Sequence, residues 1–187
     1  MSNKKFQNKY RIESNRLKGY NYSKNGAYFV TINTKNRNHF FGEIVAGKMI
    51  LNDIGEIVKN EWFLSEKLRG NIFMDEFVIM PNHIHGIVII DNESIDTLRR
   101  NISSNVKRNY IGEHKKMSEI SPQKSSLSHM IREFKSAVTK NSRKIDPKFS
   151  WQPNYYDHII RNRAEKNRIG QYIIDNPQMW GRDRNTK

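Results

Sequence analysis

Residues 77–90 carry the pattern that decides the fold: Phe77-Val78-Ile79-Met80-Pro81-Asn82-His83-Ile84-His85-Gly86-Ile87-Val88-Ile89-Ile90. Two apolar runs rich in β-branched residues flank Pro81-Asn82, a composition typical of two strands joined by a tight turn. Side chains alternate between the faces of a strand, so His83 and His85 project to one face and Ile84 to the other. Two imidazoles inside a sheet are costly to bury unless a group fills the space between them. A divalent cation is the simplest such group.

The flanking sequence predicts further elements, in the order strand 27–34, hairpin 39–45 and 48–51, helix 52–68, strands 72–80 and 83–90, helix 127–143, strand 155–160, helix 163–176. Apolar residues recur at helical spacing in the first two helices. In the first helix, we expect a buried stripe of Ile54, Ile57, Val58, Trp62 and Leu68, and the second carries Leu127, Met130, Ile131, Phe134 and Val138. This order predicts an α+β fold, a ferredoxin-like βαββαβ core with an antiparallel sheet. An extra hairpin near the N-terminus and a C-terminal helix complete it. Two helices on one face leave the opposite face, with the histidines, for a substrate.

The length of 187 residues fits a single domain over residues 1–187. Residues 1–25 form a basic N-terminal arm in this interpretation, and residues 91–126, rich in Asn, Ser and Lys, form a flexible insertion. Basic residues of the arm, Arg16 and Lys18 among them, either belong to a solvated tail or lie along a phosphate backbone.

The formal net charge of +14 favours a polyanionic partner, most simply a nucleic acid. The absence of cysteine excludes disulfides, thiolate zinc sites and cysteine nucleophiles. No apolar run approaches the roughly 20 residues that span a bilayer, and the N-terminus lacks the apolar region of a secretory signal. We therefore expect a cytoplasmic protein without a membrane partner.

The last predicted helix offers a reactive group and a third ligand. Tyr172 and Asn176 are four residues apart and so share a helical face. An amide oxygen suits Mg²⁺ or Mn²⁺ beside two imidazoles, and the tyrosine hydroxyl could act as a nucleophile. A free phenol has a pKa near 10, so a cation that polarises the scissile phosphate would assist it. The alternative is structural: Tyr172 packs on the sheet, and Asn176 ends the helix before Pro177.

Tyr155 and Tyr156 are rival nucleophiles. They are adjacent on a predicted strand and so face opposite ways, and packing or base stacking suits them better. His158 follows them, and Arg161 could hold a phosphate. We interpret these four residues, with Arg16 and Lys18, as candidates for DNA binding. The sequence contains no G-x-S-x-G element, P-loop or dinucleotide-binding glycine motif.

Five segments together resemble the REP-associated tyrosine transposases, a group of single-tyrosine HUH transposases related to small insertion-sequence transposases. The segments are RLKGYNYS (16–23), GAYFVTI (26–32), VIMPNHIHGI (78–87), WQPNYYDHIIRN (151–162) and YIIDNP (172–177). They follow one another in the expected order and leave the predicted insertion unmatched.

This resemblance implies that His83, His85 and Asn176 bind Mg²⁺ or Mn²⁺ and that Tyr172 is the nucleophile. It also implies cleavage of single-stranded DNA at hairpin-forming palindromes, through a 5′-phosphotyrosine intermediate and a free 3′-hydroxyl, followed by strand transfer. The protein would act at the nucleoid of a prokaryote-like cell. The active site is built either within one chain or across a homodimer. The alternative function is a non-catalytic DNA- or RNA-binding module on the same fold.

Overall fold

The computed structural model describes residues 17, 19–93 and 126–182. Arg16, Lys18 and most of the predicted arm and insertion lie outside these residues. The elements are β1 (Gly26–Asn33), η1 (Lys35–Arg37), β2 (Gly42–Val45), β3 (Lys48–Leu51), α1 (Asp53–Lys67), β4 (Ile72–Met80), β5 (His83–Ile90), α4 (Leu127–Ser142), β6 (Tyr156–Ile160), α5 (Arg163–Asp175) and η2 (Trp180–Arg182). Among the described residues, no helix is both long enough and apolar enough to cross a membrane.

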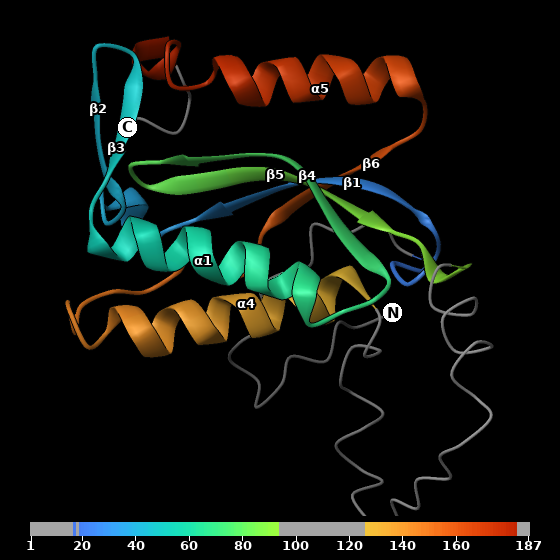
Figure 1. Cartoon of the computed structure of the whole chain (residues 1–187), viewed down its shortest axis with the longest axis horizontal. Coiled ribbons are helices and arrows are strands. Elements are labelled where there is room, and N and C mark those ends of the chain that lie inside the picture. Colours follow the sequence, from blue (N-terminus) through green and yellow to red (C-terminus); the bar gives the residue numbers. More distant parts are fainter. Residues whose placement is uncertain (1–16, 18, 94–125, 183–187) are drawn as a thin grey trace, which may run out of the picture.

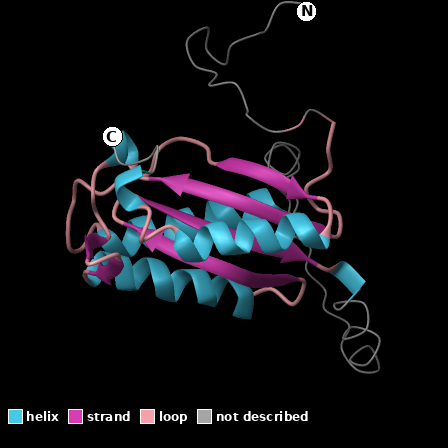
Figure 2. Cartoon of the chain, turned by 90° about the horizontal axis from the view of Figure 1, so that it is seen from above, coloured by secondary structure: helices cyan, strands magenta, loops and turns pink. Residues whose placement is uncertain are grey.

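The main sheet has the strand order β4-β5-β1-β6, and every neighbouring pair is antiparallel. This is the order of a ferredoxin-like βαββαβ fold, so the predicted fold class is confirmed. Helices α1 and α4 cover one face, α5 lies across the other, and the β2–β3 hairpin forms a separate sheet at one end (Figure 1). The view from above shows α5 running over the strands (Figure 2). The face expected to be open is therefore partly covered by the last helix.

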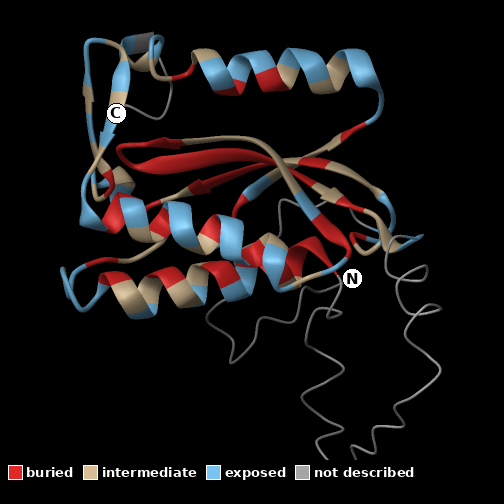
Figure 3. Cartoon of the chain, viewed as in Figure 1, coloured by how far each residue is buried: buried red, intermediate tan, exposed pale blue. Residues whose placement is uncertain are grey.

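The main core lies between the sheet and the pair α1 and α4, where buried residues concentrate (Figure 3). Trp62 is its centre: the indole is fully buried, stacks on Phe77 at 4.8 Å between ring centroids and meets Phe134 edge-on at 5.4 Å. Gly86 of β5 makes room for it, because a Cβ there would lie 2.5 Å from Cζ2 of Trp62. Aromatic packing therefore holds β5 against α1 and α4.

Helix starts follow the local sequence. The side chain of Asn52 accepts a hydrogen bond from the Gly55 N–H and caps α1. Leu68 was wrongly predicted to be buried. It is the C-cap of α1 and is 70% exposed, because the helix ends before its stripe returns to the core.

A smaller core fastens α5 to the opposite face of the sheet. Ile173 of α5 packs with Ile87 of β5 and Ile160 of β6. At the other end of the helix, Lys166 forms an ion pair with Asp75 of β4. These contacts fix the position of α5 over the strand that carries the two histidines.

Candidate active site

The two histidines of β5 lie on the face that α5 covers, while Ile84 between them belongs to the main core, as the period of a strand predicts. His83 is 0% exposed and His85 is 2% exposed. Their Nε2 atoms are 3.0 Å apart. Two buried imidazoles therefore direct their Nε2 atoms at the same small space.

Hydrogen bonds on the far side of each ring fix the orientation of both histidines. Nδ1 of His83 lies 2.7 Å from Oδ1 of Asn82, and Nδ1 of His85 lies 2.8 Å from Oγ1 of Thr31. An amide oxygen only accepts, so Nδ1 of His83 is the donor, and the threonine hydroxyl can accept in the same way. Each Nε2 then carries a lone pair, which is the state that outer partners impose on metal-binding histidines.

Aromatic rings enclose the pair on two sides. Phe29 of β1 stacks on His85 at 5.3 Å between centroids, and Trp180 of η2 stacks on His83 at 6.0 Å. Neither ring was predicted to belong to the site. The alternation of β1 could have indicated Phe29, which shares a face with Thr31, whereas Trp180 follows the helix in an irregular segment and left no signal.

Helix α5 brings Tyr172 to the histidines. Its hydroxyl oxygen lies 3.4 Å from Nε2 of His85, and its ring meets Phe29 edge-on at 6.2 Å. The side chain is nevertheless 47% exposed. The hydroxyl thus lies beside the buried imidazoles, on a side chain that is half exposed to solvent.

Asn176 follows Tyr172 by one helical turn and is the C-cap of α5. It is 3% exposed, and its Nδ2 donates to the Tyr172 carbonyl at 3.5 Å. Its Oδ1 is buried without a hydrogen-bond partner among the described residues. Buried polar atoms are rarely left unpaired, so this oxygen is suited to a partner that the protein chain does not provide.

These donors fit a divalent cation. Two nitrogens 3.0 Å apart can both contact one ion, since twice a metal–nitrogen bond of about 2.1 Å exceeds their separation. The unpaired amide oxygen adds a hard ligand of the kind that Mg²⁺ and Mn²⁺ accept. Among the described residues, no three His, Cys, Asp or Glu side chains cluster. The third ligand that these residues offer to the site is the amide oxygen of Asn176.

The predicted DNA-binding residues Tyr155, just before β6, and Tyr156, its first residue, lie on opposite faces of the sheet. Tyr156 is 50% exposed, is the Cα partner of Thr31 and meets Phe29 at 6.4 Å, so it borders the candidate site. Tyr155 takes the packing alternative: it is 9% exposed, belongs to the main core and lies 3.4 Å from the Ser128 hydroxyl.

His158 and Arg161 connect β6 to the start of α5. Nε2 of His158 lies 2.8 Å from Oε1 of Glu165, and the Arg161 N–H donates to the other carboxylate oxygen at 2.8 Å. The bond from Arg161, followed by the one from His158, lowers the pKa of Glu165. The Arg161 side chain is exposed at this corner, so it is free to meet a ligand from solvent.

No family model matches the chain. Over 174 residues, it is 38% identical to an uncharacterized protein of Haemophilus influenzae, and the match covers 90% of this chain and 89% of that protein. Its structure is similar to that of a REP-associated tyrosine transposase bound to a REP hairpin, with a TM-score of 0.56 and 20% identity, over 91% of this chain and 75% of that one. The chain belongs to the family of the Haemophilus influenzae protein, and its fold is that of a REP-associated tyrosine transposase.

Proposed function

We propose that the protein is a metal-dependent single-stranded DNA endonuclease and strand transferase in which Tyr172 is the nucleophile. The observation that carries this proposal is the position of the Tyr172 hydroxyl, 3.4 Å from a buried imidazole nitrogen on a side chain that is 47% exposed. A tyrosine that only packed on the sheet would not need a hydroxyl at this point. The shared fold with a REP-associated tyrosine transposase supports the same class of reaction.

His83, His85 and Asn176 would hold a Mg²⁺ or Mn²⁺ ion, which when bound polarises the scissile phosphate as a Lewis acid. Thr31 and Asn82 keep the lone pairs of the imidazoles directed at the ion site, through bonds of 2.8 and 2.7 Å. The unpaired oxygen of Asn176 supports its part in this set.

The reaction has two halves, cleavage and strand transfer, and each half forms one bond to phosphorus and breaks another. The Tyr172 oxygen attacks phosphorus, the bond from phosphorus to the 3′-oxygen breaks, and the 3′-oxygen leaves as a hydroxyl after it gains a proton. The phenol proton leaves to solvent, which reaches this half-exposed side chain. Attack by a second 3′-hydroxyl on the phosphotyrosine reverses these changes and releases Tyr172. The covalent link conserves the phosphodiester, so no nucleotide cofactor is needed.

A hairpin-forming single strand is the substrate that suits this chain. The structurally similar transposase is bound to a REP hairpin, and the net charge of +14 favours a phosphate backbone. Tyr156, exposed beside the candidate site, would contact the strand near the scissile bond. Arg161, exposed at the other end of β6, would contact the strand farther along, and His158 would hold that corner in place. Affinity for single strands should fall as salt is added. The slope of log affinity against log salt concentration should be about −0.7 for each phosphate that the protein neutralises.

The test is covalent trapping on hairpin oligonucleotides with randomised flanks, labelled at the 3′ end and incubated with Mn²⁺. Because the 5′-phosphate stays on the enzyme, the label should migrate with the protein. Tyr172→Phe should abolish this adduct, whereas Tyr156→Phe, which loses a hydroxyl but keeps the aromatic ring that would stack on the strand, should still form it. An adduct that survives in Tyr172→Phe contradicts the assignment. A wild-type protein that binds hairpins but forms no adduct is instead a non-catalytic binding module.

A further inference from the structure

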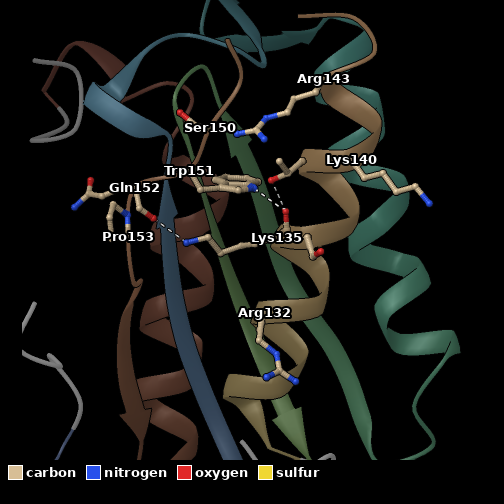
Figure 4. Close-up of a pocket in the computed structure, with 10 residues that line it drawn as sticks. Arg132, Lys135, Lys140, Arg143, Ser150, Trp151, Gln152 and Pro153 are labelled. Atoms are coloured by element: carbon tan, nitrogen blue, oxygen red, sulfur yellow. Dashed lines mark hydrogen bonds between the residues drawn. The ribbon is translucent and has the colours of Figure 1, made fainter. Parts of the chain in front are cut away.

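A basic groove lies on the other side of the sheet, between α4 and residues 150–153, with a volume of about 660 Å³ (Figure 4). We call it the α4 groove. Four of its ten lining residues are cations, namely Arg132, Lys135, Lys140 and Arg143, and none is acidic. The candidate active site uses none of these residues.

The cations form a row along α4. Their positions, 132, 135, 140 and 143, follow the helical repeat, so they project from one side of the helix. Eleven residues at a rise of 1.5 Å give the row a length of about 16 Å. One strand of a duplex carries a phosphate about every 3.4 Å along its axis, so the row spans about five phosphates. A single phosphate ion would require converging donors instead of a row.

Hydrogen bonds join α4 to the segment that forms the other wall of the groove. Nζ of Lys135 donates to the Gln152 carbonyl at 2.8 Å, and Nε1 of Trp151 donates back to the Lys135 carbonyl at 3.2 Å (Figure 4). Nζ of Lys135 also donates to the Asn154 carbonyl at 2.9 Å. Nε of Arg143 donates to the Phe149 carbonyl at 3.0 Å. Binding an extended ligand here would therefore need little ordering of the wall.

The wall of the groove is directly connected to the candidate active site. The Gln152 N–H donates to the Asn33 carbonyl at 2.9 Å, and Asn33 is the Cα partner of His83. The groove and the histidines thus share one end of β1 but lie on opposite faces of the sheet. The edge strand β6 neighbours β1, and its half-exposed Tyr156 lies where a nucleic acid could pass from one face to the other.

We infer that the α4 groove binds the phosphodiester backbone of the paired stem of the DNA hairpin whose single-stranded flank is cleaved at Tyr172. This inference rests on the proposed function for the identity of the DNA. The groove supplies charge without base readout, so it positions the substrate and leaves sequence recognition to other contacts.

The test uses the full-length chain and measures equilibrium binding by fluorescence anisotropy over a salt series. The variant is Arg132→Gln with Lys140→Gln, two exposed side chains of the row. The control is Lys59→Gln with Lys67→Gln, which removes the same charge from exposed positions on α1. The probes are a hairpin oligonucleotide, the same flank without its stem, and inorganic phosphate as a competitor.

For the hairpin, the slope of log affinity against log salt concentration should be shallower by about 1.8 in the groove variant than in the wild type. This value corresponds to the loss of two phosphate contacts at about 0.9 each. The control should keep the wild-type slope, and the two double variants should bind the stemless flank alike. Equal slopes for the two double variants, an equal loss on the stemless flank, or displacement of the hairpin by millimolar inorganic phosphate would each overturn the inference. No cleavage is required, so a protein that forms no adduct but shows the stem-specific loss contradicts the proposed function and not the groove.

Discussion

Replacing Thr31 with valine isolates one contact of the candidate metal site. Thr31 is 7% exposed, and its Oγ1 lies 2.8 Å from Nδ1 of His85, which is itself 2% exposed. Valine has nearly the same shape without the hydroxyl, so the variant removes the hydrogen bond between this side chain and Nδ1 of His85. The imidazole loses the partner that fixes both its orientation and its tautomer.

The expected size of the effect follows from this geometry. A buried donor left unpaired costs about 1–3 kcal/mol. Loss of an outer partner of a metal-binding histidine weakens metal affinity about 10- to 100-fold, or about 1.4–2.8 kcal/mol at 1.4 kcal/mol per tenfold change. The two ranges agree, so we expect the Kd for Mn²⁺ to rise by one to two orders of magnitude in Thr31→Val.

The assay is calorimetric titration of the protein with Mn²⁺ in the absence of DNA. Thr31→Ser keeps the hydroxyl and is the matched control, so it should restore most of the affinity. The reasoning is refuted if Thr31→Val binds Mn²⁺ as tightly as the wild type, or if serine is as weak as valine. Thermal unfolding without metal, measured on all three proteins, separates a loss of fold from a loss of affinity.

Three further predictions concern packing, capping and charge. Gly86→Ala should lower the free energy of unfolding by about 1–3 kcal/mol, since its Cβ would lie 2.5 Å from Trp62; an unchanged urea midpoint would contradict this packing. Asn52→Ala removes the cap bond to Gly55 and should cost about 1 kcal/mol in the same assay, and a neutral result would exclude the cap. Burial lowers the pKa of Lys135 to about 8, so its amine loses its proton as pH rises through that value. Hairpin affinity should then fall from about pH 7 to 9 and remain constant in Lys135→Arg, whose guanidinium stays charged; parallel pH profiles would refute this.

The strands and helices were predictable because their patterns are local. The apolar runs of β4 and β5, the turn at Pro81-Asn82 and the helical spacing in α4 each reveal an element without knowledge of its partners. The order of these elements then indicated a ferredoxin-like sheet. Local patterns failed for Leu68, where the end of a helix and not its spacing decides exposure.

The surroundings of the histidines were less predictable because they depend on strand register. Thr31 faces His85 only because β1 and β5 pair Thr31 with that residue, and no local pattern specifies this pairing. Trp180 reaches His83 through an irregular segment after α5. The α4 groove likewise requires residues 150–153 to fold back on the helix, which the composition of the segment does not reveal.

The most direct test of the account is the mass of the peptide that carries the DNA after covalent trapping. Tryptic cleavage after Arg161 and Arg168 places Tyr156 and Tyr172 in different peptides, so one spectrum distinguishes them. After nuclease digestion, we expect a nucleotide attached through its 5′-phosphate to the peptide that contains Tyr172, and no such mass in Tyr172→Phe. A nucleotide on the peptide that contains Tyr156, or on any other, would contradict it.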